Sequence, residues 1–158
     1  MSRLPPAPTR VLLAACVAFG AAGCAPTLRF NQTYLTQVEL KVSDKGFAAL
    51  STTGEIFDLS PIRKLEGKAD KVLLIKVHGT YFIAGDGFHN LWRLWQGGDD
   101  EAHYKPVEIE GAPRTGFGSP VLEAAGKCAV FTWSKGSGTE KRFITTGGDV
   151  DTKGCPDA

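Results

Sequence analysis

Short apolar segments separated by glycine run through most of this 158-residue chain. Residues 37–43 alternate polar and apolar side chains, which predicts a half-buried strand with Val38, Leu40 and Val42 facing inward. Residues 71–77 form an apolar run, rich in β-branched residues, that is too short for a globular helix. We expect this run to be a central strand covered on both faces.

The same pattern of short apolar segments separated by glycines continues over the rest of the chain and predicts an all-β fold. Of the 19 glycines, Gly20 and Gly23 lie in the opening segment, so 19 minus 2 leaves 17, and these fall mostly between expected strands. About nine short strands and almost no helical period indicate one small antiparallel β-barrel or β-sandwich. Ser60-Pro61 predicts one helical turn, capped by the Ser60 hydroxyl and ended by Gly67. Residues 97–103 are expected to form an acidic loop, followed by a strand at 107–110.

Three of the expected hairpins are faintly similar to the blades of a β-propeller. They begin at Gly46, Gly79 and Gly126, which are 33 (46 to 79) and 47 (79 to 126) residues apart. A propeller typically needs at least four blades of about 40 residues each. A complete propeller from this chain alone is therefore excluded.

The opening segment has the composition of a cleaved export signal. Residues 1–10 contain Arg3 and Arg10 and no acid, and residues 11–22 are uncharged and dominated by Ala, Val and Leu. Twelve residues of helix span about 18 Å, which is well short of the roughly 30 Å hydrocarbon layer. This length disfavours a permanent transmembrane helix.

The residues at the expected cleavage point, Ala21-Ala22-Gly23-Cys24, resemble the lipobox of bacterial lipoproteins. The resemblance implies that the Cys24 thiol carries a diacylglyceryl group, that the chain is cut before Cys24, and that the new amino terminus is acylated. Ala25 in place of Asp implies, by similarity to Gram-negative sorting, an outer-membrane location facing the periplasm. We therefore expect a signal peptide at 1–23, a lipidated tether at 24–31 and one β domain at 32–158.

Removal of the signal peptide sets the net charge of the mature chain, and an oxidising compartment decides the state of its remaining cysteines. The signal holds two of the 18 Lys and Arg and none of the 17 Asp and Glu, so the mature net charge is 16 minus 17, or −1, and nothing indicates a nucleic-acid partner. Cys16 leaves with the signal, and the two cysteines left over, Cys128 and Cys155, are expected to form a disulfide. A redox-active pair is the alternative, but no Cys-x-x-Cys is present.

Motifs for catalysis are absent from the sequence, and we expect neither enzymatic activity nor a cofactor. The histidines offer a weak zinc hypothesis. If the strands pair as expected, His78 and His89 lie at opposite ends of adjoining strands, Asp86 lies at the turn between them, and His103 follows. Exposed loop histidines explain the same residues better, so we predict no metal site.

A second group of residues is aromatic and basic. On a strand, Trp92 faces one way, whereas Arg93 and Trp95 face the other. Trp beside Arg is typical of a protein-binding hot spot. The alternative is that Trp92 fills the core and Trp95 shields an edge, packed under Arg93.

These observations favour a lipid-anchored, non-catalytic accessory protein that docks on a periplasmic or outer-membrane complex through a protein partner. The alternative is a small β lipoprotein that inhibits a lytic enzyme or binds a ligand. A stable multi-protein complex in membranes favours the first function, and one-to-one inhibition of a secreted hydrolase favours the second. A hydrolase that uses the histidines is a third class, which predicts activity lost on chelation.

Overall fold

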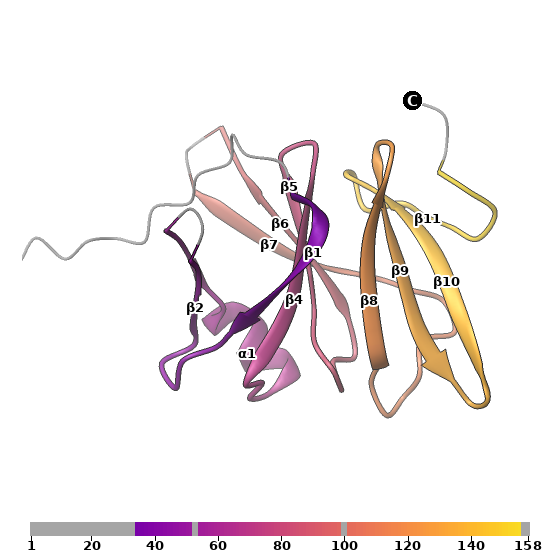
Figure 1. Cartoon of the computed structure of the whole chain (residues 1–158), viewed down its shortest axis with the longest axis horizontal. Helices are drawn as coiled ribbons and strands as arrows, with labels where there is room; N and C mark the ends of the chain where they lie inside the picture. Colours follow the sequence, from indigo (N-terminus) through magenta and orange to yellow (C-terminus); the bar gives the residue numbers. More distant parts are fainter. Residues whose placement is uncertain (1–33, 52–53, 99–100, 156–158) are drawn as a thin grey trace, which may run out of the picture.

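The computed structural model describes residues 34–51, 54–98 and 101–155, and these form three layers (Figure 1). A short hairpin and the helix lie against one face of a five-stranded sheet, and a four-stranded sheet lies against the other face. The elements are β1 (Tyr34–Lys41), β2 (Phe47–Leu50), β3 (Glu55–Asp58), α1 (Ser60–Glu66), β4 (Lys71–Val77), β5 (Thr80–Ala84), β6 (Leu91–Gln96), β7 (Ala102–Val107), β8 (Gly118–Ala125), β9 (Cys128–Lys135), β10 (Gly138–Thr145) and β11 (Val150–Asp151).

Both large sheets are antiparallel meanders. The central sheet has the order β1-β4-β5-β6-β7, and the second sheet has the order β11-β10-β9-β8. The three hairpins expected after Gly46, Gly79 and Gly126 are present as β2–β3, β5–β6 and β9–β10. The described residues contain stacked sheets and no closed barrel. Of the two all-β architectures left open by the sequence, the sandwich-like one is therefore confirmed.

Successive side chains along the strands of the central sheet point to opposite faces and pack into two separate cores. Leu74 on β4 belongs to the core under the hairpin and helix, whereas its neighbour Ile75 belongs to the core shared with the second sheet. Tyr81 and Phe82 on β5 divide between the two cores in the same way. The expected coverage of β4 on both faces is confirmed, although β4 is second in the strand order and not central.

Three aromatic rings fill the core between the two large sheets. Phe117 contacts Phe131 and Trp133 edge to face, with ring centroids 4.8 and 5.1 Å apart. At the β1 side of the interface, the backbone N–H of Leu122 donates a hydrogen bond of 2.6 Å to Oε1 of Gln37. Aromatic pairs of this kind contribute beyond their buried area, so the stacking of the sheets is specified by side-chain shape.

Glycine is required where the loop before β8 crosses the turn before β6. The N–H of Gly87 donates to the carbonyl of Phe117 at 2.8 Å, and the N–H of Phe117 donates to the carbonyl of Phe88 at 2.7 Å. Gly116 has φ +85°, and a Cβ there would overlap the carbonyl oxygen of Gly87. A side chain at this position would separate the two segments.

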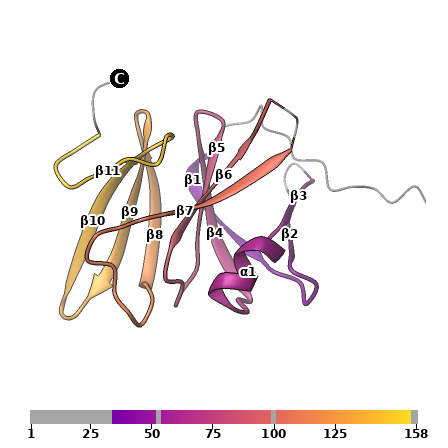
Figure 2. The ribbon, with the colours of Figure 1, turned by 180° about the vertical axis from the view of Figure 1, so that it is seen from behind.

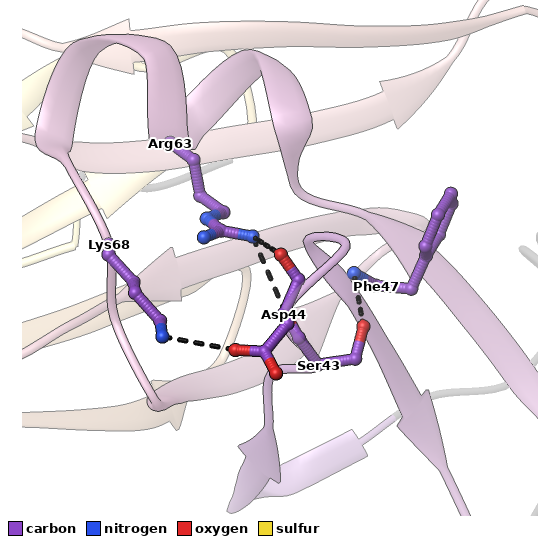
Figure 3. Close-up of polar contacts among 5 residues, drawn as sticks. All are labelled: Ser43, Asp44, Phe47, Arg63 and Lys68. Carbon is purple, nitrogen blue, oxygen red and sulfur yellow. Dashed lines mark hydrogen bonds and ion pairs between the residues drawn. The ribbon is translucent and has the colours of Figure 1, made fainter.

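The helix α1 is fastened to the turn between β1 and β2 (Figure 3). Nη1 of Arg63 donates to the carbonyl oxygens of Asp44 at 2.9 Å and Ser43 at 3.4 Å, and Nζ of Lys68 lies 3.0 Å from Oδ1 of Asp44. The hydrogen bond and charge of Lys68 lower the pKa of the Asp44 carboxyl. Both side chains of this ion pair are exposed, so we expect it to contribute little to stability.

The expected start of the helix is wrong in one respect. The N-cap position is Leu59, which makes no side-chain cap hydrogen bond, and Ser60 is already in the helix. The N–H of Ser60 donates instead to Oδ1 of Asp58 at 2.9 Å. The last residue of β3 therefore supplies the acceptor that the sequence assigned to the Ser60 hydroxyl. Gly67 ends the helix at φ +87°, as predicted.

The expected strand at 107–110 is misplaced, because β7 spans Ala102–Val107. Every residue of this strand pairs with one on β6, from Ala102 opposite Gln96 to Val107 opposite Leu91. Proline is tolerated at Pro106 because β7 is an edge strand. Val107 and Ile109, which suggested the later strand, are buried.

The structure contains the disulfide between Cys128 and Cys155. It joins the first residue of β9 to the segment after β11, with the two Cα atoms 5.8 Å apart and a sequence separation of 27. Besides this bond, the end of the described chain is held by the two residue pairs between β10 and β11 and by the packing of Val150 against the core shared by the two sheets. The bridge therefore closes the last edge of the second sheet.

We predict that removing this disulfide destabilises the domain by about 3.5 kcal/mol, the loop-entropy contribution for a loop of this length. Urea unfolding of the wild type and of the double variant Cys128→Ala, Cys155→Ala measures the difference. Reductant should lower the wild-type midpoint and leave the variant unchanged. A wild-type midpoint that does not respond to complete reduction would contradict the prediction.

Candidate functional site

The candidate site lies on the face of the central sheet that meets the second sheet, beyond the end of their shared core. Leu91 and Val107 are opposite one another and belong to that core. The next residues on the same face are Arg93 opposite Lys105 and Trp95 opposite His103. Lys105 is exposed and the other three are partly exposed. We call these four residues the quartet: Arg93, Trp95, His103 and Lys105.

The indole of Trp95 lies between two other members of the quartet. The guanidinium carbon of Arg93 is 4.4 Å from the centroid of the Trp95 ring. On the other strand, the His103 ring is stacked on the indole, with centroids 5.5 Å apart and planes 25° apart. These contacts hold the partly exposed Trp95 ring in one orientation, so a partner would meet a rigid aromatic surface.

Arg93 also ties the two sheets together. Its Nη1 donates a hydrogen bond of 2.6 Å to the carbonyl oxygen of Thr146, in the turn between β10 and β11. Burial lowers the pKa of the Arg93 guanidinium, and the charge of Asp149 in the same turn opposes that shift. Gly148 has φ +96°, and a Cβ there would lie 3.3 Å from the guanidinium. Glycine at this position leaves room for Arg93 to reach the turn.

A cleft of about 330 Å³ opens beside Arg93, between β7 and the turn that precedes β11. Figure 2 shows the chain after β7 crossing from the central sheet to the β8–β11 sheet along this side of the molecule. The cleft has two cations and one acid in its walls, together with backbone and apolar surface. Its lining residues are Arg93, Lys105, Pro106, Val107, Glu108, Gly147, Gly148 and Val150.

Strand β6, which carries Arg93 and Trp95, is held on its opposite face by the side chain of Glu66 at the end of α1, which is fully buried. Its Oε1 accepts hydrogen bonds from Nε1 of Trp92 at 2.8 Å and from Nδ2 of Asn90 at 2.7 Å, and its Oε2 accepts one from the N–H of His89 at 2.6 Å. The sequence predicted a helical turn here but no buried carboxylate. Nothing local to Glu66 shows that its partners come from a strand more than twenty residues later.

The structure confirms the predicted alternation and distinguishes the two tryptophans. Trp92 is 2% exposed and belongs to the core under the hairpin and helix. Trp95 is partly exposed and packs under Arg93, as the alternative interpretation of this strand proposed. His103 and Lys105 were missed as neighbours because β7 was expected to begin later. The alternation of His103, Lys105 and Val107 is the signal that would have identified them.

The weak metal candidates do not converge. His78, with φ +44°, lies between β4 and β5, whereas Asp86 lies beyond the other end of β5. Asp86 accepts a hydrogen bond of 3.0 Å from the N–H of Ser119, and Nδ1 of His89 lies 3.5 Å from Glu66. Residues 34–51, 54–98 and 101–155 contain no group of three or more His, Cys, Asp or Glu side chains placed to hold a metal.

A second cluster of polar groups is enclosed in the core under the hairpin. Glu55, Lys76 and Tyr81 are each 0% exposed, and the Tyr81 hydroxyl donates a hydrogen bond of 2.6 Å to Glu55. Nζ of Lys76 lies 4.6 Å from the centre of the Tyr81 ring. Burial lowers the pKa of Lys76, and the charge of Glu55 opposes the shift. Because solvent does not reach these groups, the cluster is a structural link between β3 and the central sheet.

Cys24 lies outside the described residues, so its predicted lipidation stays a prediction. In the part of the chain that the structure describes, no helix has the length and apolar character needed to cross a membrane. No protein-family model, curated protein or solved structure matches the chain. The quartet and its cleft are therefore judged on their geometry alone.

We predict that the two tryptophans of β6 differ sharply in their contribution to stability. Trp92→Ala should cost about 3–5 kcal/mol, because it leaves a cavity in the core and removes one of the partners of Glu66. Trp95→Ala should cost about 1 kcal/mol or less, because it removes a ring stacked at the surface. Chemical unfolding measures both changes. Equal losses for the two variants would be inconsistent with the assignment.

We predict that Glu66→Gln destabilises the domain by about 2–3 kcal/mol. The amide replaces one acceptor oxygen with a donor that faces other donors, and charge-assisted hydrogen bonds become neutral ones. Glu110→Gln, at an exposed position, is the matched control and should change stability by less than about 0.5 kcal/mol. Urea midpoints of the two variants that differ by less than their error would refute the prediction.

Proposed function

We propose that this protein is a lipid-anchored, non-catalytic accessory protein that docks on a periplasmic or outer-membrane assembly, with the quartet as its contact surface. The observation that carries the proposal is the partly exposed Trp95 ring, in contact with Arg93 and His103 at the end of a sheet that is buried on both faces along β4 and β5. Trp and Arg are the residues most enriched at energetic centres of protein interfaces.

The anchor in this proposal is supported by the sequence of residues 1–24. Tyr34, the first residue of β1, lies ten positions after Cys24. A fully extended chain of that length reaches about 33–36 Å. A domain held this close to a bilayer meets partners that lie in or on the same membrane, and a short tether raises their effective concentration.

The rigidity of the contact surface also supports docking. Arg93 is fixed by Thr146, and β6 is fixed from behind by Glu66. Arg93 and Trp95 thus lose little side-chain freedom when a partner binds, which reduces the entropic cost of association. The cleft beside Arg93 adds a concave surface into which a partner side chain would fit.

The test is photo-crosslinking in intact cells, followed by membrane fractionation. A photoreactive residue in place of the exposed Glu108, in the wall of the cleft, should give a discrete cross-linked band with an envelope protein. The same residue in place of the exposed Lys141, on β10, is the matched control and should give none. Adding Trp95→Ala should weaken the partner's affinity roughly 30-fold, the effect of losing a hot spot of about 2 kcal/mol.

Cys24→Ser tests the anchor in the same experiment. We expect this variant to leave the membrane fraction and to lose the cross-link. A variant that stays in the membrane, or equal cross-linking from positions 108 and 141, would overturn the proposal. A one-to-one adduct with a secreted hydrolase whose activity is blocked would instead support the inhibitor alternative.

A further inference from the structure

We propose that the cleft beside Arg93 binds a carboxylate group in an acidic segment of the partner protein. The inference rests on the proposed docking function, because it names the chemistry that the contact surface recognises. Arg93 and Lys105 lie directly opposite one another on β6 and β7 and both line the cleft. Like charges at directly opposed positions of an antiparallel pair destabilise a sheet. An anion bound between the two cations removes that repulsion.

Neither cation is neutralised by a close acid. In the described ranges, no carboxylate lies within 4.0 Å of the charged nitrogens of Arg93 or Lys105. The nearest acid acting on Arg93 is Asp149, whose carboxylate lies 3.2 Å from the hydroxyl of Thr145. Arg93 is therefore a partly desolvated cation beside an open cleft, and its charge is available to a ligand.

The guanidinium is also held in a fixed orientation. One nitrogen bonds to the carbonyl of Thr146, and the group lies over the Trp95 ring. A guanidinium has five N–H donors, so several remain after this single hydrogen bond. A planar fork with a fixed orientation suits the two oxygens of a carboxylate, and Lys105 supplies a second, mobile ammonium at the cleft wall.

The charges of the lining limit the ligand to a single negative group. Arg93 and Lys105 contribute +2 and Glu108 contributes −1, so the wall carries a net charge of +1. A phosphate dianion would bring two negative charges into the cleft beside Glu108, whereas one carboxylate of an acidic segment brings a single charge. Gly147 and Gly148 present backbone without side chains, so a partner chain can approach this wall closely. Trp95 beside the cleft then covers the apolar part of an acidic side chain.

Calorimetric titration of the purified full chain with a capped peptide of four glutamates tests this inference, with a capped peptide of four glutamines as control. We expect the glutamate peptide to bind and the glutamine peptide not to bind. Raising the salt concentration from 50 to 200 mM should weaken binding, because the cleft is open to solvent. Inorganic phosphate at the same concentration as the glutamate peptide should displace little of the bound peptide.

Variants locate the binding to the cleft. Lys105→Gln should weaken binding of the glutamate peptide about fivefold, the upper range for an exposed ion pair. Arg93→Lys should weaken it further, because the charge remains and the fork is lost. Lys141→Gln, at an exposed position on β10, is the matched control and should have no effect.

Equal binding of the two peptides, full displacement by phosphate, or equal losses for Lys105→Gln and Lys141→Gln would overturn the inference. Lys105 is exposed and makes no described ion pair, so its substitution does not threaten the fold. The outcome is independent of the cellular test. Specific peptide binding without a membrane cross-link would contradict docking alone, and a cross-link at position 108 without peptide binding would contradict only the carboxylate.

Discussion

The structure depends on the burial of one five-stranded sheet on both of its faces. Strands β4 and β5 place hydrophobic side chains alternately in two cores, so each face has to be covered by another layer. The hairpin β2–β3 and α1 cover one face, and the β8–β11 meander covers the other (Figure 1). If either covering layer were missing, one face of the sheet would expose a row of large apolar residues to water.

This arrangement also determines where the polar and aromatic side chains of the central sheet reach the surface. The second sheet does not extend over the last residues of β6 and the first residues of β7, so the face that holds Leu91 in the core continues outward as Arg93 and Trp95. Arg93 reaches back to Thr146 and thereby makes the boundary between the two sheets part of the contact surface. The acidic side chains deeper in the domain, Glu66 and Glu55, hold layers together instead.

Much of this architecture follows from local sequence patterns, and the parts that do not follow depend on contacts between distant residues. The double burial of β4, the disulfide and the opposed faces of Trp92 and Trp95 were predictable, because alternation and cysteine count are local or compositional signals. The span of β7 was not, because Pro106 and the preceding acidic residues favour a loop until pairing with β6 is known. The burial of Glu66 could not be predicted from the sequence either, since its hydrogen-bond partners become neighbours only after α1 packs on the sheet.

The central claim is that Trp95, unlike the other two tryptophans, lies at the surface among positive charges. Collisional quenching of tryptophan fluorescence by iodide and by caesium, measured on the folded protein at equal ionic strength, tests it most directly. Trp92 and Trp133 are 2% and 0% exposed, so one class of accessible tryptophan should be quenched. Iodide should quench that class more strongly than caesium, because Arg93 and Lys105 attract anions. No accessible class, or stronger quenching by caesium, would contradict the account.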